Sequence, residues 1–266
     1  MSTARLTKHH GLGNDFLVLS SDQSADASDA RTWCDRRLGV GADGLLVHGP
    51  AVADTDATMI LYNADGSRAE MSGNGIRCFA QAVAAERGMT AGTLTIATDA
   101  GVRVVELWST DDPATVEASV AMGAARAIAE PATWAALACD PLRPVAHLSL
   151  GNPHTVVAVD DVHAVDLLAL GADMPDVNLE IVQAGPERDA VTMRVHERGA
   201  GITQACGTGA CATAVAAVRW GLVDTGVTEI TVHMDGGSAK VRLDTPPGEV
   251  TLVGPATFVA AVEIIR

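Results

Sequence analysis

Met71-Ser72-Gly73-Asn74-Gly75 and Ala205-Cys206-Gly207-Thr208-Gly209 share one pattern: a hydroxyl or thiol side chain, then Gly-x-Gly, then an apolar, alanine-rich run with helical spacing. Each stretch therefore predicts a loop that enters a helix N-terminus. Glycine lets backbone N–H groups point inward and the positive helix end adds to them, so each loop suits an anionic ligand group. A cysteine at such a place is expected to have a lowered pKa. We expect the two loops to face one another across a cleft, with the chemistry between Ser72 and Cys206.

The two stretches belong to a repeat that covers more of the chain. The second lies 134 positions after the first (206 − 72), and the same offset brings Asn63 onto Glu197. Two turns, Gly13-Asn14 and Gly151-Asn152, are 138 positions apart (151 − 13), and each precedes strand-like residues. Three matches in one order favour duplicated halves. Chance recurrence of such turns in a glycine-rich chain is the alternative.

Composition bounds the class of protein. The chain has 266 residues, 48% of them hydrophobic and 19% charged, which is enough for one large domain or two ordinary ones. A net charge of −15 without a Lys/Arg cluster argues against nucleic-acid and anionic-membrane partners. Because residues 1–6 carry no apolar segment and no run of about 18 apolar residues offers a membrane span, we expect a cytoplasmic protein. The five cysteines fit neither a disulfide framework nor a metal site, and are expected to be reduced thiols.

The hydrophobic pattern predicts more strands than helices. One long helix is expected in each half, at 76–88 and 210–220, with shorter ones at 30–38, 130–138 and 162–170. Residues 4–20 are typical of two strands around a turn, and residues 93–108 of a hairpin. Further strands are expected at 45–47, 59–62, 116–120, 145–150, 155–159, 180–183, 190–195, 230–234, 239–243, 250–253 and 258–264.

A domain boundary is expected at Thr110-Asp111-Asp112-Pro113, where charge and proline interrupt the hydrophobic pattern. The half that follows repeats the order of elements of the half that precedes it. We therefore predict one domain formed by residues 1–112 plus 255–266 and a second formed by residues 113–254.

Seven turns of the chain match, in order, those of a known family. They are Gly11-Leu12-Gly13-Asn14-Asp15-Phe16, Gly41-Ala42-Asp43-Gly44, Asn63-Ala64-Asp65-Gly66-Ser67, Ser72-Gly73-Asn74-Gly75-Ile76-Arg77, Gly151-Asn152-Pro153-His154, Arg194-Val195-His196-Glu197-Arg198-Gly199 and Ala205-Cys206-Gly207-Thr208-Gly209. On these motifs the chain resembles bacterial diaminopimelate epimerase nearly end to end. The resemblance implies an α/β (α+β) fold of two similar domains from an internal duplication. Each is a mainly antiparallel sheet wrapped around a central helix, and the active site lies in the cleft between them.

The same resemblance implies an activity. It is the cofactor-independent epimerisation of LL-diaminopimelate to meso-diaminopimelate, a step toward lysine and cell-wall precursors, by a two-base mechanism. Inverting an α-carbon needs a base on one face and an acid on the other. The only lysines, Lys8 and Lys240, lie in strand-like runs, so a pyridoxal phosphate Schiff base is not expected and the carbanion must be stabilised electrostatically. The expected partner is the small-molecule substrate, and a homodimer is left open.

The family's roles carry over residue by residue. Cys206 matches the proton donor, Ser72 stands at the position of the proton-acceptor cysteine, and His154 helps to set the protonation of the thiol. The substrate-binding positions are Asn14, Asn63, Gly73, Asn74, Asn152, Asn178, Glu197, Arg198, Gly207 and Thr208. Backbone N–H groups of the glycine loops suit the α-carboxylate, and Glu197 with Arg198 suits the distal ammonium and carboxylate.

The chain departs from the family at Ser72, where the family has a cysteine. A thiol titrates near about 8.5, whereas a serine hydroxyl needs a strong adjacent base, so two-base turnover should be impaired. Three explanations are open: an engineered Cys→Ser variant, a natural one-base relative, or substitution by Cys78, which we expect to point into the core. A second departure is Ile202, where the family usually carries a glutamate.

Two other functions are compatible with the sequence. A non-catalytic amino-acid binding relative would keep the loops that bind carboxylates, and a lyase would remove an α-proton with Cys206 alone. The singled-out residues also have purely structural interpretations. The asparagines could be turn formers, His154 an ordinary buried histidine, Glu197-Arg198 a surface pair and Cys206 a small core residue. Exchange of the substrate α-proton with deuterated solvent separates these functions.

Overall fold

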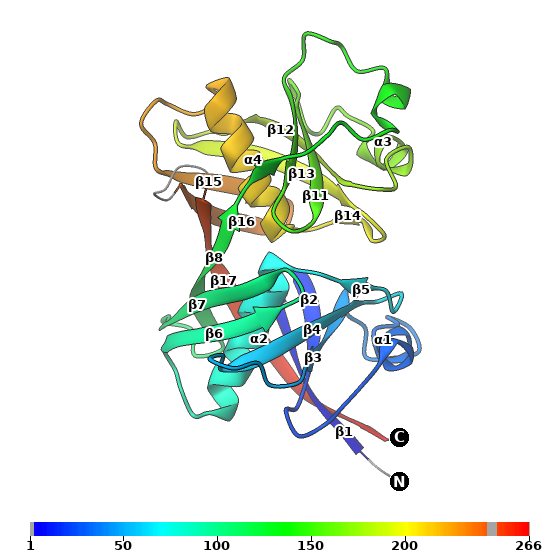
Figure 1. Cartoon of the computed structure of the whole chain (residues 1–266), viewed down its shortest axis with the longest axis vertical. Coiled ribbons are helices and arrows are strands. Elements are labelled where there is room, and N and C mark those ends of the chain that lie inside the picture. Colours follow the sequence, from blue (N-terminus) through cyan, green and yellow to red (C-terminus); the bar gives the residue numbers. More distant parts are fainter. Residues whose placement is uncertain (1–2, 244–248, 266) are drawn as a thin grey trace. The chain divides into compact units, whose positions relative to one another are not determined.

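The computed structural model describes residues 3–243 and 249–265 and contains two compact units (Figure 1). Unit 1 comprises Met1–Val120 and Gly254–Arg266, and unit 2 comprises Ala121–Val253. Two strands, β8 (Thr115–Ala124) and β17 (Glu249–Ile265), continue from one unit into the other. The domain boundaries given above, at 112/113 and 254/255, stay a prediction about folding units.

Unit 1 is a curved, mainly antiparallel sheet around one long helix. Strand β1 pairs antiparallel with β2 and β17, β2 pairs parallel with β3, β4 pairs antiparallel with β3 and parallel with β6, and β6, β7 and β8 continue antiparallel. Its other elements are β1 (Thr3–Gly11), β2 (Asn14–Leu19), α1 (Ala27–Trp33), β3 (Gly44–His48), β4 (Ala57–Asn63), β5 (Arg68–Ala69), α2 (Gly73–Glu86), β6 (Gly92–Thr98) and β7 (Gly101–Ser109).

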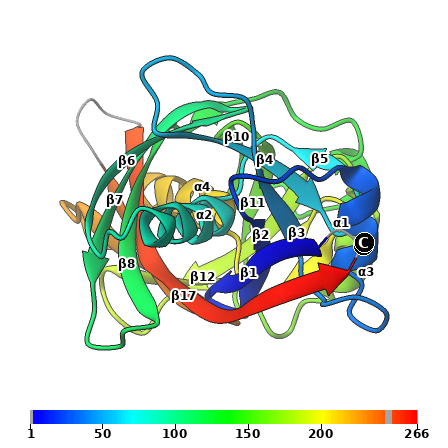
Figure 2. The same cartoon turned by 90° about the horizontal axis from the view of Figure 1, so that it is seen from below.

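Helix α2 is the core of unit 1. Every residue from Gly73 to Ala84 is buried, on all sides of the helix. A helix that is buried all round needs cover on all sides. Strands β1, β2, β4 and β7 contact the helix, and Figure 2 shows α2 inside the curve of the strands of unit 1. Cys78 is fully buried in it, as expected from the sequence.

Unit 2 repeats the arrangement with its own long helix. Strand β11 pairs antiparallel with β10 and parallel with β12, β12 pairs antiparallel with β13, and β13 pairs antiparallel with β14 and parallel with β15, which pairs antiparallel with β16. Helix α4 contacts strands on several sides: β10, β11, β12, β13, β15 and β16. The elements are β9 (Arg126–Ala127), the 3-10 turn η1 (Trp134–Leu137), β10 (Val145–Ser149), β11 (Pro153–Ala158), α3 (Leu167–Ala172), β12 (Asn178–Ala184), β13 (Ala190–Glu197), β14 (Gly201–Thr203), α4 (Gly207–Trp220), β15 (Glu229–Met234) and β16 (Gly237–Leu243).

The two units match element by element. In each, a parallel strand pair (β2–β3 or β11–β12) is followed by an antiparallel partner (β4 or β13) and then by a helix of 14 residues. Both helices begin directly after the predicted residues, Ser72 and Cys206. The predicted fold of two similar halves, each a mainly antiparallel sheet around a central helix, is confirmed.

Three of the shorter helical segments differ from the sequence prediction. Helix α1 begins earlier than residue 30 because Asp26 and Asp29 form a capping box. It ends at Trp33, and the Asp35 side chain then accepts hydrogen bonds from the backbone N–H groups of Arg37 and Leu38. Helix α3 starts at Leu167, after an Asp166 cap, rather than at 162. The segment 130–138 forms only the short turn η1.

The expected strands at 250–253 and 258–264 are one continuous strand, β17. A proline inside a strand removes one backbone N–H from a ladder. However, Pro255 lies between the stretch that pairs with β16, up to Val253, and the stretch that pairs with β1, from Thr257. The missing N–H therefore falls between these two ladders.

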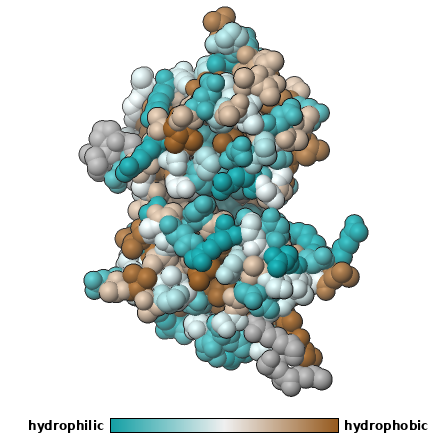
Figure 3. Space-filling model, turned by 45° about the vertical axis from the view of Figure 1, so that its right-hand side comes forward, coloured by the Kyte–Doolittle hydropathy of each residue, from teal (hydrophilic) through white to brown (hydrophobic). Residues whose placement is uncertain are grey.

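The surface drawn in Figure 3 is mostly hydrophilic or neutral, with hydrophobic residues scattered over it in small groups. Within residues 3–243 and 249–265, no helix is long and apolar enough to cross a membrane.

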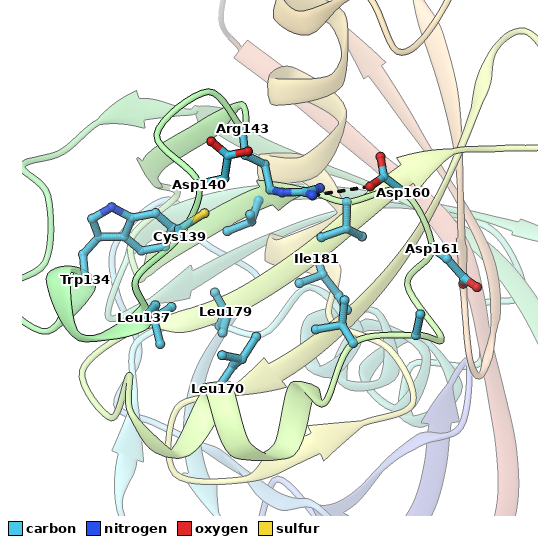
Figure 4. Close-up of a pocket in the computed structure, with 14 residues that line it drawn as sticks. Trp134, Leu137, Cys139, Asp140, Arg143, Asp160, Asp161, Leu170, Leu179 and Ile181 are labelled. Carbon is cyan, nitrogen blue, oxygen red and sulfur yellow. Dashed lines mark hydrogen bonds and ion pairs between the residues drawn. The ribbon is translucent and has the colours of Figure 1, made fainter.

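Unit 2 also contains a second small core with an incompletely filled space. The side chains of Leu179 and Ile181 form one wall of a cavity of about 410 Å³, and η1 and the segment up to Arg143 border it on another side (Figure 4). Val157 also lines this cavity. Arg143 reaches Asp160 across its edge at 3.4 Å. Because side chains alternate across a strand, Leu179 and Ile181 leave Glu180 on the opposite face of β12.

Candidate active site

The loop before α2 is organised by Ser72. Its backbone is extended and its Oγ accepts a hydrogen bond from the Gly75 N–H at 3.0 Å, so the side chain caps the helix. Gly73 and Asn74 follow within the buried first turn. The serine is half-buried, so the hydroxyl that caps the helix keeps some exposure.

A buried polar network surrounds this loop. Asn74 Nδ2 donates to Asn14 Oδ1 at 3.1 Å, and Arg77 Nη2 donates to Asn74 Oδ1 at 2.8 Å. Asn14 in turn donates to Asp43 Oδ2 at 2.8 Å. The structure thus brings together the predicted site residues Asn14 and Asn74. It adds Arg77, a fully buried arginine to which the sequence prediction gave no role.

Asn63 is engaged elsewhere in unit 1. It ends β4, and its Nδ2 donates to Ser67 Oγ at 3.0 Å within the turn that follows. Asp65 Oδ1 accepts from the backbone N–H and the hydroxyl of the same serine. These contacts are those of a turn-forming asparagine, which is one of its two sequence-based interpretations.

Cys206 occupies in unit 2 the position that Ser72 occupies in unit 1. Its Sγ accepts from the Gly209 N–H at 3.4 Å and lies 3.5 Å from Thr208 Oγ1. The residue is only 4% exposed, and Gly207 and Thr208 are buried beside it. The thiol therefore caps α4 from within the protein interior.

The expected lowering of the Cys206 pKa was wrong. Burial raises the pKa of the thiol well above its ordinary value, and the carboxylates of Glu197 and Glu180 raise it further. The Thr208 hydroxyl and the Gly209 N–H act in the opposite direction but do not prevail. A helix N-terminus lowers a thiol pKa only when desolvation and nearby anions do not outweigh it. The resting thiol is accordingly protonated, which suits a proton donor.

Two carboxyl groups in unit 2 share the surroundings of the thiol. Glu197, at the end of β13, interacts with Cys206 and accepts from the Thr203 hydroxyl at 2.5 Å. Glu180 lies fully buried on β12. Burial raises the pKa of both carboxyl groups, so each holds its proton more readily than an exposed glutamate does.

His154 is a buried histidine with partners at both ring nitrogens. Its Nδ1 lies 2.7 Å from Glu180 Oε1 and its Nε2 lies 3.0 Å from Asn152 Oδ1. Asn152 Nδ2 then donates to Thr208 Oγ1 at 3.2 Å. Four predicted residues, His154, Asn152, Thr208 and Cys206, thus form one hydrogen-bonded chain, to which Glu180 is an addition.

Asn178 ties two loops of unit 2 together. Its Oδ1 accepts from the Arg198 backbone N–H at 2.9 Å, and its Nδ2 donates to the Pro153 carbonyl at 3.0 Å. Asn178 is buried, whereas Arg198, whose backbone it holds, is exposed. The contacts position the Arg198 loop beside the segment that carries His154.

The raised pKa of Cys206 predicts its reactivity. Because only the thiolate is nucleophilic, alkylation of Cys206 by iodoacetamide should rise about tenfold per pH unit and continue to rise above pH 9. Glu197→Gln should speed the reaction at pH 8, because it removes a nearby negative charge. Glu130→Gln, an exposed change in the same unit, is the control. Mass-spectrometric mapping measures the rate, and a plateau reached below pH 8 would contradict the raised pKa.

Comparison with known proteins identifies a family that matches most of the chain. The sequence profile of the family Diaminopimelate epimerase matches residues 6–128 and 147–259. The diaminopimelate epimerase of Thermosynechococcus vestitus is 40% identical over 95% of this chain and 96% of its own length. That of Magnetococcus marinus is 41% identical over 98% of this chain and 97% of its own length.

Solved structures with the same fold carry several names. A predicted epimerase from Pseudomonas aeruginosa superposes with a TM-score of 0.78 at 16% identity and covers 99% of both chains. A hydroxyproline epimerase from Agrobacterium vitis, with bound trans-4-hydroxy-L-proline, gives a TM-score of 0.70 at 15% identity and covers 99% of this chain and 91% of its own. At these identities the likeness concerns the fold alone.

Proposed function

The chain belongs to the diaminopimelate epimerase family, and from this premise we propose that it binds LL- and meso-diaminopimelate and moves the α-proton with Cys206. Family membership makes it an amino-acid epimerase, an isomerase that works without pyridoxal phosphate. The single observation that carries the proposal is the buried thiol of Cys206 at the start of α4, which contacts Thr208 and Gly209 within the motif that the family marks.

The thiol supplies one of the two groups that epimerisation needs. In the direction from LL- to meso-diaminopimelate, Cys206 donates its proton to the α-carbon, and in the reverse direction its thiolate removes that proton. Glu197 accepts and returns the thiol proton in this scheme because it contacts both the thiol and the Thr203 hydroxyl. The N–H groups of Gly207 and Thr208 at the helix start hold the substrate carboxylate.

Ser72 is the less effective of the two proposed acid/base groups, Ser72 and Cys206. A serine hydroxyl keeps the helix cap, but it does not form an anion near neutral pH without a strong base. The cysteine within α2, Cys78, does not replace it, since that side chain is fully buried inside the helix, six positions beyond the N-cap. We therefore propose that this chain performs proton exchange on one face of the α-carbon and epimerises slowly.

Each unit holds candidate substrate-binding side chains in place by its own hydrogen bonds. In unit 1, Arg77 holds Asn74 and Asn14 in place, and in unit 2, Asn178 holds the Arg198 loop. We propose that the Arg198 loop recognises the distal amino-acid end, so that a substrate without that end binds poorly.

Calorimetry tests this assignment directly. We expect LL- and meso-diaminopimelate to bind the purified chain without added cofactor, with dissociation constants on the order of micromolar to millimolar, the range usual for enzyme substrates. 2-Aminopimelate, which lacks the distal ammonium, is the matched control and should bind at least tenfold more weakly, roughly the effect of one unpaired charged group. Absence of heat with both diaminopimelate isomers would count against the proposed substrate.

A further inference from the structure

Glu180 is a buried carboxyl group inside an otherwise apolar strand segment, Leu179-Glu180-Ile181-Val182. Its side chain has no exposure, and its Oε1 lies 2.7 Å from His154 Nδ1. In the part of the chain that the structure describes, its second oxygen, Oε2, has no hydrogen-bond partner. Burial of a carboxyl group costs folding free energy unless a hydrogen-bond partner compensates for the lost water, and here that partner is His154.

The hydrogen bonds beyond His154 have a fixed direction. Asn152 Nδ2 donates to Thr208 Oγ1, so the amide oxygen of Asn152 faces His154 Nε2 and can only accept. His154 Nε2 must therefore carry a proton. Because the Thr208 oxygen already accepts from Asn152, its hydroxyl proton is free to point at Cys206 Sγ, 3.5 Å away. The chain thus runs from His154 as donor toward the thiol.

The state of the ring depends on the group at Nδ1. A carboxylate facing Nδ1 favours a ring protonated at both nitrogens, and a protonated carboxyl group donates to Nδ1 and leaves the proton on Nε2. Both arrangements keep Nε2–H directed at Asn152. Without a group at Nδ1, the Asn152 amide could turn over and either ring tautomer would become accessible.

Gly209 shows that the structure makes room for this carboxyl group. A Cβ at residue 209 would lie 2.6 Å from Glu180 Oε1. In unit 1 the matching glycine, Gly75, has the Phe16 ring at 3.4 Å instead. Phe16 corresponds to His154, since each is the first partner in the register of its parallel strand pair. The duplicated halves have thus diverged here, and only the half with the thiol has a histidine and a carboxyl group at these contacts.

We propose that Glu180 is a positioning residue: it holds His154 with a proton on Nε2 and thereby orients the Asn152 amide and the Thr208 hydroxyl toward the Cys206 thiol. The effect on substrate rests on the proposed function, whereas the orientation of the hydrogen-bonded chain does not.

A purely electrostatic role for Glu180 predicts a different result for a variant that lacks the carboxyl group. Four residues act on the thiol: Glu197 from β13, Glu180 from β12, and Thr208 and Gly209 from its own helix. The carboxylates raise its pKa, so loss of the Glu180 charge alone would make Cys206 more reactive. Loss of positioning makes substrate binding weaker.

The test is nitrogen NMR of histidine in the native chain, with the His154 signals assigned by a His154→Gln variant. We expect a protonated Nε2 in the native protein between pH 6 and 9. Glu180→Gln should keep it, because the glutamine amide can donate to Nδ1. Glu180→Leu should give a mixture of tautomers. Val182→Ala, a fully buried change on the same strand, is the matched control and should leave the spectrum unchanged.

Binding supplies the second readout. Glu180→Leu should weaken diaminopimelate binding about tenfold, the effect expected for one lost hydrogen bond to a charged group, and Glu180→Gln should restore most of it. An unprotonated Nε2 in the native protein, or an unchanged spectrum in Glu180→Leu, would overturn the proposal. If Glu180→Leu does not fold, the native and Glu180→Gln spectra still decide. If the native chain does not bind diaminopimelate, the substrate assignment fails while the spectra still test Glu180.

Discussion

Ser72→Cys is expected to raise the rate of diaminopimelate epimerisation by about 10² to 10⁴-fold over the native chain, the usual contribution of one positioned acid or base. The substitution places a thiol where Ser72 Oγ now accepts the Gly75 N–H, at the start of a helix of 14 residues. A thiol there can exchange protons near neutral pH, which a serine hydroxyl cannot. Conversion of LL- to meso-diaminopimelate, followed by chiral chromatography, measures the gain.

The control for this gain is the second thiol. Cys206→Ala in the Ser72→Cys protein should remove the gain, because both faces of the α-carbon must then be served by one group. Cys211→Ala, on the same helix and fully buried, should leave it in place. If Ser72→Cys folds, binds diaminopimelate and still does not epimerise it, the serine is not the sole defect. Ile202, which is exposed on β14, would then be the next residue to change.

Arg77→Ala is expected to lower the free energy of unfolding by about 3–5 kcal/mol, as large-to-small changes that also leave buried polar groups unpaired typically do. The guanidinium is fully buried and donates to the Gly73 carbonyl at 3.1 Å, to Asn74 Oδ1 at 2.8 Å and to the Pro255 carbonyl at 3.3 Å. The change removes all three donors and leaves a cavity beside the first turn of α2. Urea unfolding followed by circular dichroism measures the loss.

Arg87→Ala is the matched control for this prediction. It removes an arginine from the C-terminal cap of the same helix, where the side chain is 40% exposed and pairs with Asp56 at 2.9 Å. Exposed ion pairs contribute little, so the loss should stay below about 1 kcal/mol. Equal losses for the two variants would show that the buried network around Asn74 does not stabilise unit 1 in the way described.

The elements with the strongest patterns were predictable from the sequence. Helices α2 and α4 combine a capping side chain, glycine and a long apolar run, and both were expected from the sequence, although each begins three residues earlier than predicted, at Gly73 and Gly207. The hairpin of β6 and β7 also has the alternation that predicts it. The ends of helix α1 were harder to predict because Asp side chains cap the turns there. The continuity of strand β17 was harder to predict because it depends on Pro255 lying between the residues that pair with β16 and those that pair with β1.

The site was predictable in its motifs and not in its electrostatics. Helix position alone indicated a lowered pKa for Cys206, whereas burial and the two carboxyl groups raise it. Glu180 and His154 lie 26 positions apart in the sequence, and their contact arises from the pairing of β11 with β12. One signal was present: Glu180 and Arg77 are charged residues inside apolar runs, and burial of such residues requires partners.

The central claim, that this chain is a diaminopimelate epimerase reduced to one working thiol, is tested most directly by α-proton exchange in deuterated water. We predict that meso-diaminopimelate exchanges the proton of its D-configured α-carbon, the one that Cys206 removes in the reverse reaction, while LL-diaminopimelate exchanges far more slowly and little inversion occurs. Cys206→Ala should abolish the exchange. Exchange of neither isomer, or exchange that persists in Cys206→Ala, would contradict the account.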